Sequence, residues 1–414
     1  FVFISFAGIQ VQVKNLDPGS FFFLSYKTNN RCENAMSFLN VNLLAAGREN
    51  LAKKQVERRS ANITGDKLLI TRRQFNLGAG DASNINEYQK YILLFNLENW
   101  WHQLEDVTFE TRVVELSREN GRKLRESYDK LQKGDNSKVN VSNVFPELHQ
   151  RLQECMLVVS TGEKSGCFVK TSSRSAKDFA DEGYLRGAFG KTYKRLNEKS
   201  ENAKLIAMSY ASMELLKMKN SRQVLENFIR SERIWHDMHL ALAQNQVWNE
   251  CIVVRKWVNI EPDMEFRCFV YAGKLTAISQ YRHLIYFPRL HKNEKFLKDT
   301  IVEFLENTLM KKLNGVFPQD DYIVDLAIEL SADIKPENCL RPMALDASME
   351  KIWAVEVNPF YETTDACLFS WNKDASSILM NTEKTNTAMR IRTLPAKGAT
   401  SLVYGIWKDI LVRA

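Results

Sequence analysis

The sequence lacks several features that would place it in a familiar functional class. Its 414 residues contain no run of about 18 apolar side chains, so we expect no membrane-spanning helix. The 7 cysteines show no paired two-residue spacing, which leaves no readable zinc framework or disulfide ladder and favours buried thiols in a reducing, cytosolic setting. The 57 basic and 50 acidic residues form no long run of one sign, so a dedicated nucleic-acid surface is not indicated.

Catalytic and phosphate-binding motifs with a fixed local pattern are also missing. The segment 183–190 contains glycines but has no strand just before it and no Lys-Ser/Thr ending, unlike a common phosphate-binding loop. No Ser-His-Asp or Cys-His order can be defined. His236 and His239 share one face of a predicted helix without a third ligand nearby in the sequence, so we interpret them as surface or packing residues. A bound nucleotide would have to be held by strands and their side chains.

The composition that is present, 44% hydrophobic and 26% charged, is that of a globular protein with enough length for two or three domains. We divide the chain into an N-terminal extension of unknown role over 1–90, a central domain over 91–374 and a C-terminal tail over 375–414. Residues 1–13 are apolar but lack a basic lead-in and a cleavage site, so they are interpreted as a strand or an incomplete start of the chain.

Helical and alternating patterns interleave in the central domain, which favours an α+β architecture. Ala272-Gly273 predicts a tight hairpin turn, Ser221 a helix N-cap, and Gly315 the end of a helix. Helices are expected at 118–131, 203–217, 221–244 and 294–314. Strands are expected at 107–116, 251–258, 265–271, 274–279, 322–330 and 351–357, with an inserted loop at 331–350.

Three oxygen-bearing side chains on two of these strands are the strongest functional signal. Glu356 and Asn358 project from the same side of their strand, because side chains alternate along it. Asp325 interrupts an otherwise apolar strand, where an unpaired carboxylate would be costly to bury. Carboxylate and amide oxygens suit Mg²⁺ held together with the phosphates of a nucleotide. The alternative is that Asp325 and Glu356 are ordinary strand-end residues facing water.

Basic side chains on neighbouring strands could hold the phosphates. Arg267 is fixed on a strand and can donate two parallel hydrogen bonds to an anion, although a cross-strand ion pair with a carboxylate is an equal alternative. Lys170 ends an apolar strand and enters a Ser-rich loop, where it would bind an anion or lie solvated. The run Arg255, Lys256 and Trp257 could lend backbone groups to a purine ring, as a weak signal.

Together these runs resemble the cell division cycle protein 123 family, roughly over 91–374. The motifs that carry the resemblance are Val253–Val258, Glu265–Val270, Gly273–Leu275 with Ile278–Gln280, and Ile352–Phe360 through Thr364–Asp365 to Leu368–Trp371. The resemblance implies an ATP-grasp fold, in which ATP lies between two α+β subdomains with antiparallel-rich sheets. Position by position, it implies that Lys170 and Arg267 contact the phosphates and that Asp325, Glu356 and Asn358 bind Mg²⁺.

The same resemblance implies a function. Family members act as assembly chaperones for eukaryotic translation initiation factor 2, binding its gamma subunit and promoting its joining to the other subunits. We therefore expect a cytoplasmic monomer that binds no nucleic acid directly and inserts into no membrane. The chain departs from the family where Glu356 replaces an Asp, where Tyr281 precedes Arg282 instead of an Arg directly after Gln280, and in insertions at 179–200 and 331–350.

Two other functions are compatible with the sequence, one that uses the same residues and one that does not. An ATP-grasp ligase would activate a carboxylate as an acyl phosphate and pass it to an amine, with the metal and Arg267 stabilising the transferring phosphoryl group. A scaffold would retain the fold without using the nucleotide pocket. Release of ADP that depends on an added substrate separates the ligase from the chaperone, and the absence of any ATP binding would leave only the scaffold.

Overall fold

The computed structural model describes residues 2–6, 9–13, 91–134, 139–160, 166–178, 182–243, 248–331, 335–345, 348–384, 386–403 and 406–413. The chain divides into two compact units, Phe1–Tyr91 and Ile92–Ala414. In the first unit, strands β1 (Val2–Phe6) and β2 (Ile9–Val13) pair antiparallel, so part of the apolar start of the chain is a hairpin. None of the helices among the described residues is long and apolar enough to cross a membrane.

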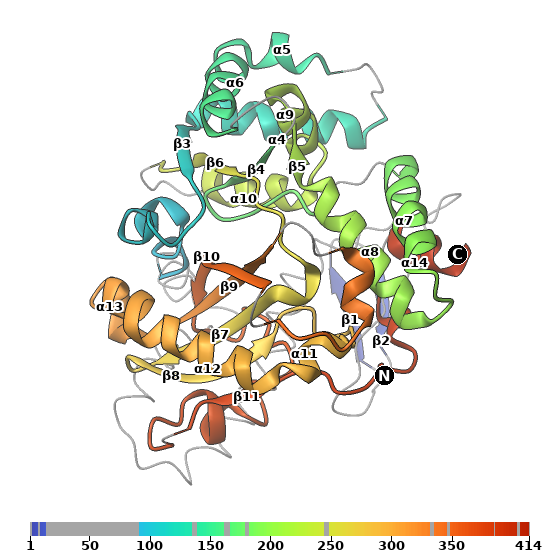
Figure 1. Ribbon diagram of the computed structural model, residues 1–414. Helices are drawn as coiled ribbons and strands as arrows, with labels where there is room; N and C mark the ends of the chain where they lie inside the picture. Colours follow the sequence, from blue (N-terminus) through green and yellow to red (C-terminus); the bar gives the residue numbers. More distant parts are fainter. Residues whose placement is uncertain are drawn as a thin grey trace. The chain divides into compact units, whose positions relative to one another are not determined.

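The second unit contains a four-stranded antiparallel sheet in the order β3-β6-β4-β5. Its strands are β3 (Thr111–Glu115), β6 (Cys251–Lys256), β4 (Cys167–Thr171) and β5 (Lys217–Met218). The helices beside it are α4 (Arg118–Gln132), α5 (Val141–Val144), α6 (Pro146–Val159), α9 (Ser221–Phe228) and α10 (Glu232–Ala243) (Figure 1). Apolar side chains from one face of the sheet and from these helices form a buried core, for example Val254 with Leu152 and Phe228. We call this part the four-stranded lobe.

A five-stranded sheet in the order β10-β9-β7-β8-β11 forms the second lobe. Its strands are β7 (Glu265–Tyr271), β8 (Lys274–Gln280), β9 (Tyr322–Leu330), β10 (Met349–Pro359) and β11 (Ala388–Arg390). Helices α11 (Pro288–Lys292), α12 (Glu294–Phe304) and α13 (Met310–Leu313) run beside it, with a π-helical turn at Leu305–Leu309 (Figure 1). The remaining helices are α7 (Glu182–Leu196), α8 (Glu201–Leu215) and α14 (Ile406–Arg413). We call this part the five-stranded lobe.

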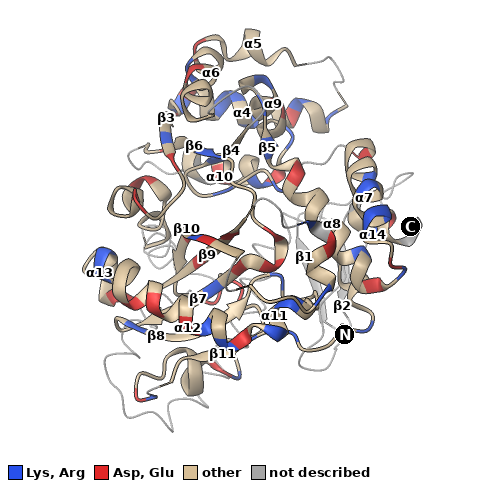
Figure 2. Cartoon of the chain, in the orientation of Figure 1, with Lys and Arg blue, Asp and Glu red and all other residues tan. Residues whose placement is uncertain are grey.

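Antiparallel-rich sheets flanked by helices confirm the α+β prediction, whereas the ATP-grasp assignment stays a prediction. Figure 2 shows that basic and acidic residues are intermixed along these elements. The assignment of 375–414 to a tail also stays a prediction, although this stretch contributes β11, which pairs parallel with β8.

Several helices and strands begin or end at residues other than those predicted. The helix expected at 221–244 is two helices, because Ser231 interrupts it and its hydroxyl accepts a hydrogen bond from the Ile234 amide at 3.2 Å, as an N-cap does. The first of these helices is capped by Asn220, which accepts from the Gln223 amide at 2.9 Å, and the Ser221 N-cap prediction was wrong. The strand expected at 107–116 is shorter, since Thr108 pairs with Ala354 of the other sheet.

The hairpin and helix-end predictions were confirmed. Ala272 and Gly273 form the tight turn between β7 and β8, and both have positive φ angles, of 48° and 67°. Gly315 also has a positive φ, of 74°, just after α13. In the predicted loop at 331–350, the described residues contain a 3-10 turn at Pro336–Leu340 before β10 begins at Met349.

Candidate functional site

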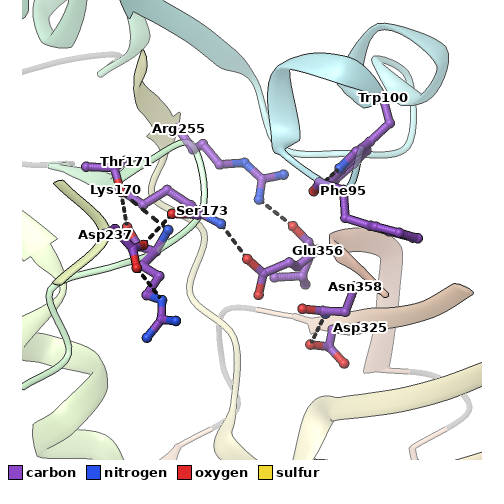
Figure 3. A network of polar contacts seen from close by, with 12 residues as sticks. Phe95, Trp100, Lys170, Thr171, Ser173, Asp237, Arg255, Asp325, Glu356 and Asn358 are labelled. Atoms are coloured by element: carbon purple, nitrogen blue, oxygen red, sulfur yellow. Dashed lines mark hydrogen bonds and ion pairs between the residues drawn. The ribbon is translucent and has the colours of Figure 1, made fainter. Parts of the chain in front are cut away.

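Strand register brings the predicted metal-binding residues together on one face of the five-stranded sheet. Asp325 on β9 lies directly opposite Glu356 on β10 and opposite Arg267 on β7. Opposite residues of antiparallel strands project from the same face, and Asn358 shares it because it follows Glu356 by two positions. The Asn358 amide nitrogen donates to Asp325 Oδ2 at 3.2 Å (Figure 3). The three oxygen-bearing side chains therefore converge, and their binding of a metal stays a prediction.

A β-bulge in β10 determines which of its side chains project from this face of the sheet. The pairing with β9 shifts between Ala354 and Glu356, so that Val355 has no partner in the register. A bulge adds one residue to one strand and bends it, which here lets Trp353, opposite Ala327, share a face with Glu356, opposite Asp325. The bulge thus turns two side chains an odd number of residues apart towards the same side of the sheet.

Arg267 and Asp325 form a buried ion pair with two parallel hydrogen bonds. Nε and Nη2 of Arg267 each donate to a different oxygen of Asp325 at 2.8 Å, and the two residues are 6% and 5% exposed. Burial works to lower the pKa of Arg267, but the carboxylate outweighs it and raises that pKa well above its ordinary value. Burial raises the pKa of Asp325, and the guanidinium opposes this. The cross-strand ion pair considered for Arg267 is therefore what the structure contains.

The oxygen atoms that converge around Asp325 fit a hard divalent cation. A carboxylate has about four lone-pair sites, and the described donors to Asp325 are the two from Arg267 and the one from Asn358. Among the described residues, no hydrogen-bond donor contacts the side-chain oxygen Oδ1 of Asn358 or Oε2 of Glu356. One lone pair of Asp325, one amide oxygen and one carboxylate oxygen are thus available, which is the oxygen chemistry that Mg²⁺ takes.

Lys170 connects the two lobes at this point. Its ammonium, only 4% exposed, donates to Oε1 of Glu356 across the space between the sheets (Figure 3). Burial would raise the pKa of Glu356, but Lys170 and then Lys177 outweigh it and hold the pKa at about 2. The solvated strand end considered for Lys170 is not observed. Lys170 instead lies beside Glu356, one of the three converging oxygen-bearing side chains, and its contact with phosphates stays a prediction.

Lys177 is a further cation that the sequence did not single out. Its side chain is exposed, and the phenol of Tyr281 and the carboxylate of Glu356 both raise its pKa. Tyr281 in turn lies under the guanidinium of Arg267, 5.0 Å from the ring centroid. The only sequence signal for Lys177 is its place in the Ser-rich loop after Lys170. The hydroxyls of that loop are engaged within the protein, since Ser173 donates to Asp237 and Ser172 donates to the Cys251 carbonyl.

The side chain of Arg255 is buried between the two lobes, and the predicted role of its backbone beside a purine stays a prediction. It is 1% exposed, and its guanidinium donates to the carbonyl of Val355, the bulge residue, and to the hydroxyl of Thr108. Burial lowers its pKa to about 10, while Glu356 works in the opposite direction. The Arg255 side chain therefore joins the backbone of β10 to the four-stranded lobe, and its guanidinium is not available to a ligand.

Lys256 and Trp257 line a cavity of about 740 Å³. The residues of the converging set do not line it, namely Lys170, Arg267, Asp325, Glu356 and Asn358. Its other walls include Phe109 on the four-stranded lobe and Lys351 with Trp353 on β10. The Lys351 ammonium lies over the Trp353 ring, 3.8 Å from its centroid. The structure therefore brings together Lys170, Arg267, Asp325, Glu356 and Asn358, and places Lys256 and Trp257 apart from them. Of the two predicted helical histidines, His239 stacks on Trp235 at 5.1 Å between ring centroids.

Comparison with known proteins gives a family model that matches most of the five-stranded lobe. The family model described as D123 matches residues 202–402, which include Arg267, Asp325, Glu356 and Asn358. A protein of Danio rerio named translation initiation factor eIF2 assembly protein is 27% identical over 150 residues, covering 36% of this chain and 37% of that protein. The cell division cycle protein 123 of Candida glabrata is 32% identical over 156 residues, covering 34% and 36%.

The chain thus spans little more than a third of the length of these curated relatives. The solved structure of Cdc123 from Schizosaccharomyces pombe aligns with 73% of this chain and 96% of that one, at 20% identity and a TM-score of 0.47. Residues 202–402 of the chain are thus similar to the D123 family, and the similar proteins include one named cell division cycle protein 123.

Proposed function

We propose that this chain binds ATP and Mg²⁺ in the manner of an ATP-grasp protein and acts in the cytoplasm as a monomeric assembly factor for eukaryotic translation initiation factor 2, through the gamma subunit. The observation that supports nucleotide binding is the convergence of three oxygen ligands and two cations where β7, β9 and β10 face Lys170. Support for the assembly role comes from relatives named translation initiation factor eIF2 assembly protein.

Each converging side chain has a distinct task in this proposal. Asp325, Glu356 and Asn358 would hold Mg²⁺, and bound ATP would supply the polyphosphate charge that the cation bridges and a phosphoryl group that can be transferred. Lys170 already spans the two lobes, so it can exchange Glu356 for a phosphate oxygen with little movement. Arg267, fixed by Asp325, presents a rigid cation beside the same position. The backbone of 255–257 would face the purine.

The cleanest test uses Asn358, because removing its amide leaves the buried Arg267–Asp325 pair intact. Calorimetric titration of the full chain with ATP in the presence of Mg²⁺ should give one site. Asn358→Ala should weaken that site roughly 10- to 100-fold, as loss of a metal-site group does. Asn314→Ala, at an exposed asparagine that follows α13 and does not belong to the converging set, is the matched control and should bind like wild type. Equal affinities of wild type and Asn358→Ala would refute the assignment of the metal site.

The assembly role needs a separate measurement. The full chain, immobilised, should capture the purified gamma subunit of initiation factor 2 at micromolar concentration. If capture fails while ATP still binds, the partner assignment is wrong and the nucleotide site stands. If capture succeeds and Asn358→Ala captures equally well with and without ATP, nucleotide binding has no part in partner binding.

A ligase is a second candidate, which the presence of two lysines around Glu356 favours. Lys170 contacts Glu356 and Lys177 acts on it electrostatically, so two cations would lie beside phosphates held by Mg²⁺. Positioning and electrostatic stabilisation are the main contributions of a protein to phosphoryl transfer. ADP release that requires an added carboxylate and amine would support the ligase. A broad substrate screen without turnover would support the assembly factor.

A further inference from the structure

We propose that His283, Asp365 and Cys367 form a binding site for a transition-metal ion of the Zn²⁺ class, beside the oxygen ligands described above and distinct from them. The imidazole, one carboxylate oxygen and the thiol sulfur lie within 4.8 Å of one another. Ligands at Zn–S and Zn–N distances of about 2.3 and 2.0 Å in a tetrahedron are roughly 3.5 Å apart. Small side-chain rotations therefore suffice to close the set around one ion.

The chemistry of the three ligands selects the ion. Sulfur and imidazole nitrogen are ligands for Zn²⁺ and related metals, whereas Mg²⁺ and Ca²⁺ are held by oxygen. The neighbouring set of Asp325, Glu356 and Asn358 offers only oxygen. Two sites of different ligand type thus lie in one lobe, and the set that contains sulfur and nitrogen should bind Zn²⁺ in preference to Mg²⁺. Three protein ligands leave the fourth tetrahedral position open for water or for a ligand atom.

The backbone holds the three ligands in place before any ion arrives. Cys367 adopts a positive φ of 55° and its amide donates to Asp365 Oδ1 at 2.8 Å, which keeps these two side chains adjacent. Arg267 donates to the Asp365 carbonyl at 2.7 Å, and Arg392 donates to the His283 carbonyl at 2.6 Å. Ligands whose positions are fixed by neighbouring hydrogen bonds need little reorganisation to bind a metal.

The three side chains have few other partners. Burial raises the pKa of Cys367 to about 12, and Arg267, which hydrogen-bonds that side chain, works against the rise, so a bound metal would displace the thiol proton. Among the described residues, no hydrogen bond reaches the ring nitrogens of His283, and no basic side chain forms an ion pair with Asp365. His283 and Cys367 are half-buried and Asp365 is exposed, so an ion has access from solvent. A thiolate and a carboxylate together supply two negative charges, which match a dication.

The test is a titration of the metal-free full chain with Co²⁺, which replaces Zn²⁺ and reports a cysteine ligand by a sulfur-to-cobalt charge-transfer band. Wild type should bind one equivalent with this band, and Zn²⁺ should abolish it. Cys367→Ser should lose the band, and His283→Ala should weaken binding roughly tenfold or more. Cys155→Ser, a partly buried cysteine outside the cluster, should behave as wild type. A band that survives in Cys367→Ser, or no band at all, would overturn the proposal.

A second measurement avoids any variant. Cys367 and Cys251 are both partly buried thiols in the same chain, so each should react slowly with iodoacetamide. Zn²⁺ at a concentration that saturates the Co²⁺ site should protect Cys367 at least severalfold, as peptide mass spectrometry would show, and should leave Cys251 unchanged. Equal alkylation of Cys367 with and without Zn²⁺ would contradict the site. Neither experiment contains a nucleotide, so its outcome is independent of the proposed ATP site.

Discussion

At the scale of single residues, Asp325 serves the fold as well as the proposed metal site. Both of its oxygens accept hydrogen bonds from Arg267, and both residues are almost fully buried. Removing one member of a buried ion pair leaves the other charge without compensation. A loss of ATP binding in an Asp325 variant would therefore not separate a role as a metal ligand from unfolding. Asn358 forms no ion pair, so its substitution leaves no buried charge uncompensated.

This double role gives the first stability prediction. Asp325→Ala should lower the free energy of unfolding by about 3–5 kcal/mol, because Arg267 stays buried and unpaired. The double variant Asp325→Leu with Arg267→Met should recover most of that loss, since apolar side chains of similar size can replace a buried pair. Urea denaturation at pH 7 measures both. If the double variant is no more stable than Asp325→Ala, the cost lies in packing and not in the orphaned charge.

Glu250 should make stability depend on pH. Burial raises its pKa from the ordinary value of 4.5 to about 7, with Asp237 and Glu98 adding to the effect. Between these two pH values the unfolded chain has lost the proton while the folded chain retains it, so stability falls as pH rises and levels off above pH 7. Glu250→Gln should remove this loss and gain up to about 3 kcal/mol relative to wild type at pH 8, but little at pH 4.

Urea denaturation of wild type and Glu250→Gln at the two pH values provides the measurement. Glu303→Gln, on the exposed face of α12, serves as the control and should change neither stability nor its pH dependence. A gain for Glu250→Gln of the same size at pH 4 and pH 8 would show that packing, and not ionisation, is responsible.

The converging oxygen ligands could be predicted from the sequence because each depends on a short-range rule. Alternation places Glu356 and Asn358 on one side, and the apolar neighbours of Asp325 mark it as buried. The pairing of Arg267 with Asp325 could not be chosen over phosphate binding, because it depends on the register between β7 and β9. The His283 cluster was beyond prediction for the same reason, since His283 and Cys367 belong to loops far apart in the sequence that meet only in the folded lobe.

At the scale of elements, the turn between β7 and β8 is a place where the sequence is not optimal. Both central residues have positive φ, the pattern of a type I′ turn, for which Asn-Gly is the preferred pair. Ala272 carries a side chain that favours negative φ and is exposed, so it contributes conformational strain without packing. The Asp321 side chain accepts a hydrogen bond from the Ala272 amide at 2.6 Å, which helps to hold this conformation.

Ala272→Asn should therefore stabilise the protein by about 0.5–1 kcal/mol, because asparagine tolerates the left-handed conformation. Gly273→Ala should destabilise it by about 1–2 kcal/mol for the opposite reason. The nearest atom to a Cβ at position 273 is Cβ of Asp320 at 3.8 Å, so this loss is conformational and not steric. Thermal denaturation of both variants provides the measurement. A destabilised Ala272→Asn would mean that the turn changes type.

Element boundaries show where sequence patterns stop being informative. The hairpin and α4 follow from local signals, namely a glycine turn and helical periodicity, and were placed within a residue or two. The bulge at Val355 has no such signal, since the run from Ile352 to Val357 is apolar except for Glu356 and reads as one uninterrupted strand. At that point Arg255 and Thr108 of the other lobe bind the backbone of β10, and these contacts depend on the folded arrangement of the lobes.

At the scale of the whole second unit, few polar contacts join the two lobes near the proposed site. Thr108 and Arg255 bind the backbone of β10, and Lys170 binds Glu356. The first two contacts bind the backbone of β10, whereas Lys170 binds a side chain that a ligand could replace. We therefore infer that Arg255 sets the relative position of the lobes, and that Lys170 is the part of the junction that responds to an anion.

Arg255 provides the test of this division. Arg255→Met keeps most of the side-chain volume but leaves the Val355 carbonyl and the Thr108 hydroxyl without their donor, so we expect a loss of about 2–4 kcal/mol in the free energy of unfolding. Arg255→Lys should not restore it, because one ammonium cannot reach both acceptors in the geometry of a planar guanidinium. Lys170→Met should cost less, since Glu356 is partly exposed and can be hydrated. Urea denaturation ranks the three variants, and a Lys170→Met variant less stable than Arg255→Met would reverse the roles assigned to the two cations.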